Sequence, residues 1–142
     1  MYATLSDTIQ AQLEVEIEKT YYEFTRYKLP ATFALLYFNG ELPLKVVQDL
    51  IRTTDSVLWL NNNYYFFIFH YTEETDAIKA AENLIYGVDK YLNNTDSYIA
   101  LDSIDTIESA HSTLQRLYQI VQEAKRHANN RVEDENILND IY

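Results

Sequence analysis

The chain has 142 residues, of which 47% are hydrophobic, so it is long enough for one globular domain with its own core. Its net charge of −11 argues against binding to nucleic acids or anionic membranes, because both require a basic surface. The absence of cysteine excludes disulfides, thiolate catalysis and Cys-ligated zinc, and two glycines are too few for a glycine-rich phosphate loop.

Two further absences bear on location and on metals. The sequence has no apolar run of about 18 residues and no signal peptide, so we expect a cytoplasmic protein without membrane insertion. The three histidines, His70, His111 and His127, are far apart and lack the i,i+4 spacing of a helical metal site. We therefore predict neither a metal nor a cofactor.

The first helix is predicted over Asp7–Lys28, with Asp7 as its N-cap and Gln10 three residues later. Such a helix could pack on its own domain, or it could pair with the same helix of a second copy. Both interpretations use the same apolar stripe, which consists of Ile9, Leu13, Ile17, Tyr21 and Phe24.

A central strand and a short helix follow. Leu29-Pro30 ends the first helix, and Ala31–Phe38 is apolar except for one threonine, which is typical of a buried central strand. Asn39-Gly40 ends this strand as a turn. Pro43 suits the first turn of a helix, whose apolar face would be Leu44, Val47, Leu50 and Ile51.

The middle of the chain, Arg52–His70, predicts a β-hairpin. Two apolar runs, Val57–Leu60 and Tyr64–Phe69, are joined by three asparagines, which tolerate a positive φ. Apolar side chains fall on both faces of each run, so we expect both strands to be buried in the centre of a sheet that is covered by helices.

The last part of the chain alternates helix and strand again. A helix is predicted over Thr75–Leu92 and a short strand over Ser97–Leu101. The last helix is predicted to run from Asp105 to about Ala128, and Asp105 with Glu108 would form its capping box. The apolar residues of that helix are Ile107, Leu114, Leu117, Val121 and Ala124. Residues 129–132 could form an edge strand. The acidic tail could be a short helix docked on the domain or on a partner, or it could be frayed.

The resulting order is helix, strand, helix, hairpin, helix, strand, helix. Strands that alternate with helices around an antiparallel hairpin predict a mixed sheet covered by helices, as in the α/β sandwich of ferredoxin-like or nucleotidyl-cyclase-like folds. We divide the chain into an N-terminal helix (1–28), the sheet domain (29–132) and an acidic C-terminal tail (133–142).

Four stretches in this order resemble the bacterial GGDEF domains that make cyclic di-GMP: RYKLPATFALLYFN, RTTDSVLWLNNNYYFFIF, TDAIKAAENL and LQRLYQIVQEAKRHANNRV. The likeness places the five signature positions on Asn61, Asn62, Asn63, Tyr64 and Tyr65, so the signature is degenerate. Glycines that admit the substrate phosphates and carboxylates that bind metal are both replaced.

Other departures agree with this one. The resemblance places the metal-binding aspartate of the first strand at Tyr37 or Asn39, and the segment that holds the substrate guanine is largely missing before Arg52. One phosphate-contacting lysine matches Lys125. Since phosphoryl transfer relies on metal ions to neutralise charge, we expect no cyclase activity and no catalytic residues.

One ligand site of the family is matched. The family's product-inhibition site is an Arg-x-x-Asp five residues before the signature, and Arg52 and Asp55 keep that spacing. The resemblance therefore implies a cyclic di-GMP receptor, with Arg52 and Asp55 as main contacts and Lys79 and Asn83 as auxiliary ones. An arginine can grip a guanine or a phosphate with two hydrogen bonds. Alternatively, the two residues simply pair with each other.

Two other functions remain open. The chain could be a nucleotide-independent protein-interaction or dimerisation module that uses its first helix, its acidic tail and its thirteen tyrosines. It could also bind GTP at the former substrate site as a regulator, although the residues at Asn63 and Tyr64 argue against that. A protein partner or a homodimer is compatible with each of these functions.

Overall fold

The computed structural model describes residues 5–104, 109–127 and 130–139. Its centre is a five-stranded sheet with the strand order β2-β3-β1-β4-β5. The pairs β2–β3, β3–β1 and β1–β4 are antiparallel, and β4–β5 is parallel, so the sheet is mixed, as predicted. The strands are β1 (Ala31–Tyr37), β2 (Ser56–Asn61), β3 (Tyr64–His70), β4 (Tyr98–Ser103) and β5 (Val132–Glu133).

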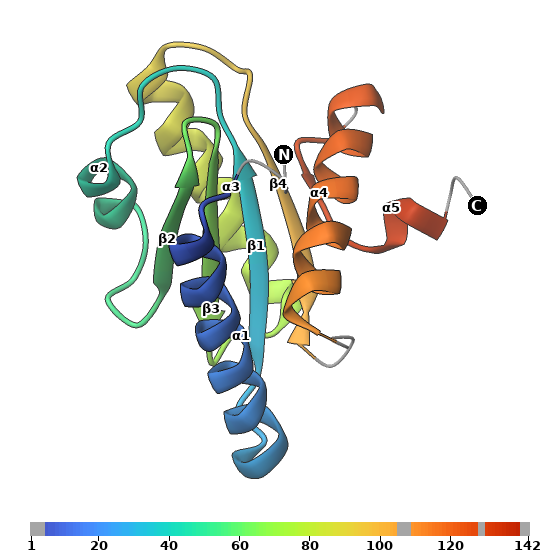
Figure 1. Ribbon diagram of the computed structural model, residues 1–142. Helices are drawn as coiled ribbons and strands as arrows, with labels where there is room; N and C mark the ends of the chain where they lie inside the picture. The colour runs from blue at the N-terminus through green and yellow to red at the C-terminus, as the bar shows by residue number, and fades with distance from the viewer. Residues whose placement is uncertain (1–4, 105–108, 128–129, 140–142) are drawn as a thin grey trace.

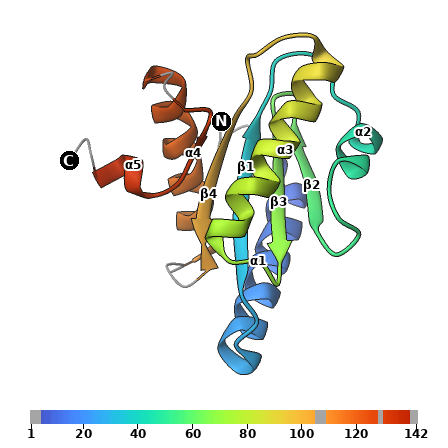
Figure 2. The same cartoon turned by 180° about the vertical axis from the view of Figure 1, so that it is seen from behind.

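Helices cover both faces of this sheet (Figures 1 and 2). One hydrophobic core lies between the sheet and α1 and α4, and the second lies between the sheet and α2 and α3. Successive side chains of β1 and β3 point to opposite faces of the sheet and so enter both cores, which is why these runs are apolar at nearly every position. The helices are α1 (Asp7–Tyr27), α2 (Leu44–Asp49), α3 (Glu74–Leu92), α4 (Ala110–His127) and α5 (Asn136–Asn139).

Helix α1 packs on its own sheet through Leu13 and Ile17, which are buried in the first core. Its N-cap is Ser6, whose hydroxyl accepts from the backbone N–H of Ile9 at 3.2 Å, so the assignment of the cap to Asp7 was wrong. Serine and aspartate cap equally well, and only the backbone conformation decides between neighbours. None of the described helices is long and apolar enough to cross a membrane.

The hairpin forms, but two of its predicted details were wrong. Strand β3 is buried from Tyr64 to Phe69, whereas β2 is an edge strand in which only Leu60 is buried and Trp59 is 43% exposed. Neither residue of the turn, Asn62 or Asn63, has a positive φ. Instead the Asn63 N–H donates to Oδ1 of Asn61 at 2.9 Å, and the strand pairing is irregular at Leu60.

The second half of the chain follows the predicted order with shifted boundaries. Pro43 is the N-cap of α2 rather than a residue of its first turn, and only Val47 of that short helix is buried. The predicted capping residues Asp105 and Glu108, the apolar Ile107 and the helix end at Ala128 lie outside the described residues.

The C-terminal segment docks on the domain. The predicted edge strand is β5, which is two residues long, and α5 follows it. Ile137 of α5 is only 8% exposed and belongs to the core beside α4. Of the three alternatives for the tail, the described part therefore has the short helix docked on its own domain.

Three carboxyl groups meet where this segment crosses the start of α3. One oxygen atom each of Glu74, Asp134 and Glu135 lies within 4.8 Å of the others. Burial, followed by hydrogen bonds and repulsion from the other two groups, raises the pKa of Glu74 to about 8. The folded protein thus holds a proton on Glu74 that the unfolded chain loses near its ordinary pKa of 4.5.

We predict that this cluster makes stability fall as the pH rises from about 4.5 to about 8, since the native state binds the proton more tightly than the unfolded state. Glu74→Gln keeps a hydrogen-bonding group without the charge, so it should stabilise the protein at about pH 8.5 and change little at about pH 5. Urea denaturation at both pH values measures this. Glu73→Gln, one residue earlier and exposed, is the matched control, and an equal effect of both variants would contradict the prediction.

Candidate functional site

The Arg-x-x-Asp motif forms a turn between α2 and β2. The backbone N–H of Asp55 donates to the carbonyl of Arg52 at 3.0 Å, which closes the turn. In return, the backbone N–H of Arg52 donates to Oδ2 of Asp55 at 3.0 Å. The motif therefore closes its own turn through hydrogen bonds between residues three apart, and this explains the value of an i,i+3 spacing at this point.

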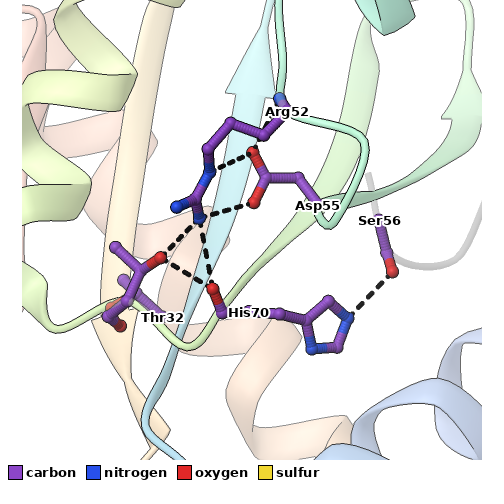
Figure 3. Close-up of polar contacts among 6 residues, drawn as sticks. Thr32, Arg52, Asp55, Ser56 and His70 are labelled. Atoms are coloured by element: carbon purple, nitrogen blue, oxygen red, sulfur yellow. Dashed lines mark hydrogen bonds and ion pairs between the residues drawn. The ribbon is translucent and has the colours of Figure 1, made fainter.

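The two side chains form a two-pronged ion pair (Figure 3). Nε of Arg52 donates to Oδ2 of Asp55 at 3.3 Å, and Nη2 donates to Oδ1 at 2.8 Å. The Asp55 side chain is only 2% exposed, whereas the Arg52 side chain is 56% exposed. The hydrogen bond to Asp55 raises the pKa of Arg52 above its ordinary value. Asp55 is thus the buried anchor, and Arg52 is the group presented to solvent.

The Arg52 side chain is also tied to the loop that follows β3. Nη2 donates to the carbonyl of His70 at 3.1 Å and to Oγ1 of Thr72 at 2.5 Å. The carbonyl of Thr72 in turn accepts from Oγ1 of the buried Thr32 on β1 at 3.0 Å. These bonds use Nε and Nη2, and Nη1 makes no hydrogen bond to any residue that the structure describes. Arg52 is therefore held in one orientation with one nitrogen left to donate.

His70 lies between the motif and the start of β2 (Figure 3). Its Nε2 is 2.9 Å from Oγ of Ser56, and burial lowers the pKa of the ring. A neutral ring beside Ser56 adds no positive charge near Arg52. The cation of the motif is therefore Arg52 alone.

A cavity of about 440 Å³ lies against this pair, between α2 and α3. Asn83 lines it together with Arg52 and Asp55, so the structure brings three of the four predicted ligand residues together. Lys79 lies outside this cavity on the exposed side of α3. Sequence reasoning missed two carboxylates of the cavity, Asp49 and Asp76. Asp76 could have been found from its position seven residues before Asn83, which places both on one face of a helix.

The other candidate region is the turn of the hairpin. Nδ2 of Asn63 donates to the carbonyl of Phe38 at 3.1 Å, and the backbone N–H of Phe38 donates to the carbonyl of Asn63 at 3.0 Å. The hydroxyl of the buried Tyr65 donates to the carbonyl of Leu42 at 2.6 Å. The asparagine and tyrosine side chains of this turn are used to hold the end of β1 and the loop that follows it.

Next to the turn, aromatic side chains from three elements pack together. The ring of Tyr64 lies 5.5 Å from that of Tyr37 on β1 and 6.0 Å from that of Tyr118 on α4. Gln122 donates to the Tyr64 hydroxyl at 3.3 Å, and Nζ of Lys125 lies 3.8 Å from the centre of the Tyr37 ring. Burial, with smaller effects from the neighbouring tyrosines, raises the pKa of the Tyr64 hydroxyl. The space is thus filled by neutral rings and one lysine.

One carboxylate, Asp96, is close to this aromatic cluster. It adds to the effect of burial in raising the pKa of Tyr37. However, its Oδ2 accepts from Nδ2 of Asn39 at 3.1 Å, in the loop after β1. The residues of the cluster that the structure describes offer a stacking surface and a cation, which is different chemistry from a pair of metal-binding carboxylates.

The arrangement of elements has clear counterparts among solved structures. The GGDEF domain of DgcB from Caulobacter crescentus, solved in complex with c-di-GMP, has a TM-score of 0.68 and 13% identity, over 85% of this chain and 86% of that one. The FimX GGDEF domain from Pseudomonas aeruginosa has a TM-score of 0.72 and 12% identity, over 88% and 92%.

A third structure is the diguanylate cyclase SiaD from Pseudomonas aeruginosa in complex with its activator SiaC, with a TM-score of 0.69 and 11% identity. The match covers 87% of this chain but only 56% of SiaD. No protein-family model matches the sequence, and no curated protein has a significantly similar sequence. The similarity therefore lies in the arrangement of the elements, and this chain has the fold of the GGDEF domains of diguanylate cyclases.

Proposed function

We propose that this chain is a non-catalytic GGDEF-fold domain that binds cyclic di-GMP beside Arg52 and Asp55. The observation that carries the proposal is the state of Arg52. Its guanidinium is oriented by a buried carboxylate, the Arg52 side chain is 56% exposed and lines a cavity, and Nη1 makes no hydrogen bond to a described residue. A preoriented arginine loses little freedom on binding, which favours ligand recognition over a purely structural ion pair.

The surrounding residues suit a guanine base. Nη1 of Arg52 and the amide of Asn83 can donate to guanine O6 or N7. Because Asp55 is already engaged with Arg52, the acceptors for the guanine N1 and N2 donors would be Asp49 and Asp76, which line the same cavity. Lys79, outside the cavity, would act only by longer-range attraction to the phosphates.

The absence of catalysis is a separate part of the proposal. Asn63 and Tyr64 stand at the positions where active cyclases have carboxylates. The Asn63 side chain holds the Phe38 carbonyl, and the Tyr64 ring is packed against Tyr37 and Tyr118. A magnesium ion requires anionic oxygen ligands, and Asp96 is engaged with Asn39. These contacts support a binding role for the domain rather than turnover of GTP.

Calorimetric titration with cyclic di-GMP tests the binding. We expect a Kd of about 100 μM or lower, which corresponds to about −5.5 kcal/mol or better. Arg52→Lys should weaken the affinity at least about tenfold, because a lysine cannot reproduce the fixed guanidinium fork. Arg26→Lys, an exposed arginine on α1, is the matched control.

Two results would contradict the proposal. Absence of heat at about 100 μM ligand would remove the binding function. Equal binding by the wild type and Arg52→Lys would place the ligand elsewhere. Incubation with GTP and Mg²⁺, followed by chromatography, tests the other part, and formation of cyclic di-GMP would show that the domain is an enzyme.

A second candidate function is protein interaction without a nucleotide. The observation that favours it is an apolar surface on α3, where Tyr86 and Tyr91 are exposed beside Leu50 and Gly87. Aromatic residues of this kind are enriched in protein interfaces. Light scattering of the wild type and of Tyr86→Ser measures homodimer formation, and a monomer at all concentrations would exclude self-association through this surface.

A further inference from the structure

A second cavity lies on the other side of the Arg52–Asp55 turn, along the edge of the sheet. This edge cleft, of about 450 Å³, has the first half of β2, Ser56–Leu58, on its floor together with Phe66 and Ile68 of β3. One wall is α1, through Gln12, Leu13 and Glu16, and the other is the segment from Gln48 to Thr53. The cleft therefore exposes the start of an edge strand between two walls.

Strand β2 is unusual for an edge strand. Among the described strands it pairs only with β3, so alternate backbone groups on its outer side have no strand partner (Figures 1 and 2). Proteins normally protect such an edge with charged residues, proline or bulges. The strand sequence SVLWLN contains no charged residue, proline or glycine, and its irregular position, Leu60, lies beyond the part of the strand in the cleft.

The walls determine what can occupy this edge. A second copy would bring its own α1 and its own Gln48–Thr53 segment against the walls of the first, and both copies carry a net charge of −11. A single extended segment carries no flanking helix or loop, so it can enter the cleft without meeting the two walls. Its alternating side chains would meet Leu58 and Phe66 on the α1 side and Ile51 and Val57 on the other.

The charge of the cleft indicates the chemistry of that segment. Glu16 stands in the α1 wall, and the one cation of the lining, Arg52, is already neutralised by Asp55. We propose that the free edge of β2 accepts, as an added strand, an extended segment of a partner protein in which apolar residues alternate with lysine or arginine. Main-chain hydrogen bonds would supply the affinity, and the apolar floor and Glu16 would supply the selectivity.

The first test uses a displayed library of extended peptides of about seven residues, in which Val, Ile, Leu or Phe alternates with Lys, Arg, Ser or Thr. We expect clones that bind the wild type and that bind Glu16→Lys at least about tenfold more weakly than Glu18→Lys. Glu18 is exposed on the same helix outside the cleft, so both variants change the net charge equally. Absence of such clones would overturn the proposal.

The second test examines the hydrogen bonds of the best clone. Two synthetic versions carry N-methyl groups on the two alternate sets of amides. An added strand loses affinity in one version and retains it in the other, since only one set faces β2. Hydrogen exchange of the amides of residues 56–59 should slow on binding of the unmodified peptide.

Three results would overturn the added strand. They are equal affinity of both N-methylated versions, protection of α3 in place of β2, and a dimer whose β2 amides are protected without peptide. Cyclic di-GMP binding is measured separately and does not enter this test, because Glu16 does not line the cavity between α2 and α3.

Discussion

Tyr64→Glu is expected to lower the free energy of unfolding by about 3–5 kcal/mol at about pH 8. Tyr64 is 6% exposed, and its neighbours are the rings of Tyr37 and Tyr118. A carboxylate at this position would lose its hydration. The described side chain that donates to Tyr64 is Gln122, whose amide is neutral, and the nearby Lys125 ammonium lies over the Tyr37 ring. The substitution places an acidic residue at a position that we propose corresponds to an acidic one in active cyclases, and we expect it to destabilise the fold without creating cyclase activity.

The pH dependence of this variant gives a second measurement. Burial would raise the pKa of the new carboxyl above its ordinary value of about 4.3, so the folded state would bind its proton more tightly than the unfolded state. The loss of stability should therefore grow as the pH rises above about 4.3 and be smallest in acid. Urea denaturation of the variant and of the wild type over this pH range measures the difference in free energy of unfolding.

Tyr64→Phe is the control for the lost hydroxyl. It removes only the hydrogen bond from Gln122, which is 3.3 Å long, and should cost about 1 kcal/mol or less. If Tyr64→Glu were as stable as Tyr64→Phe at about pH 8, water or a cation would reach the site. In that case the aromatic cluster would be open to ions, and a metal ion could reach it.

Arg52→Ala is expected to cost about 2–4 kcal/mol, more than the cost of Asp55→Ala, about 1–3 kcal/mol. Removing Arg52 leaves the Asp55 carboxylate, only 2% exposed, without its two side-chain donors. Removing Asp55 leaves an arginine that is 56% exposed and can be hydrated. Removing Arg52 is therefore more costly than removing Asp55, because the carboxylate that remains is shielded from water.

A double-mutant cycle in urea measures this difference. The double variant should be less destabilised than the sum of the single variants, since the two residues contact each other. Arg26→Ala, an exposed arginine of α1, is the control and should change stability by less than about 0.5 kcal/mol. If Arg52→Ala cost less than Asp55→Ala, the carboxylate would have found water or another donor, and Asp55 would not be the buried anchor of the pair.

This asymmetry also affects the ligand experiment. A loss of cyclic di-GMP binding in Arg52→Ala could reflect an unfolded loop as well as a lost contact. Arg52→Lys keeps a cation next to Asp55 and is therefore the better variant for the titration. Binding and stability should be measured on the same samples, so that the two effects are separated.

Much of the fold could be predicted from local patterns. The order of helices and strands, the central position of β1, the hairpin and the amphipathic α3 follow from hydrophobic periodicity, turn residues and segment length, which are properties of neighbouring residues. The turn from Arg52 to Asp55 is also local, because its hydrogen bonds join residues three apart. These features needed no knowledge of which segments meet in space.

The rest depended on contacts between distant segments. The apolar run Val57–Leu60 is consistent with a central strand or with an edge strand beneath helices, and only the strand order placed it at the edge. Asp49 and Asn83 belong to different helices, so their meeting at one cavity with Arg52 cannot be read from spacing. Likewise the cap at Ser6 required a backbone conformation that its neighbour Asp7 does not share.

The sequence by itself determined that this chain is a mixed α/β domain with an Arg-x-x-Asp turn and a hairpin whose turn is made of asparagines. Only the tertiary structure decided that Asp55 is buried while Arg52 faces outward, and that tyrosines from β1, β3 and α4 fill the space beside the turn. The reason is physical: periodicity records which face of an element is apolar, but burial and electrostatics depend on which element covers that face.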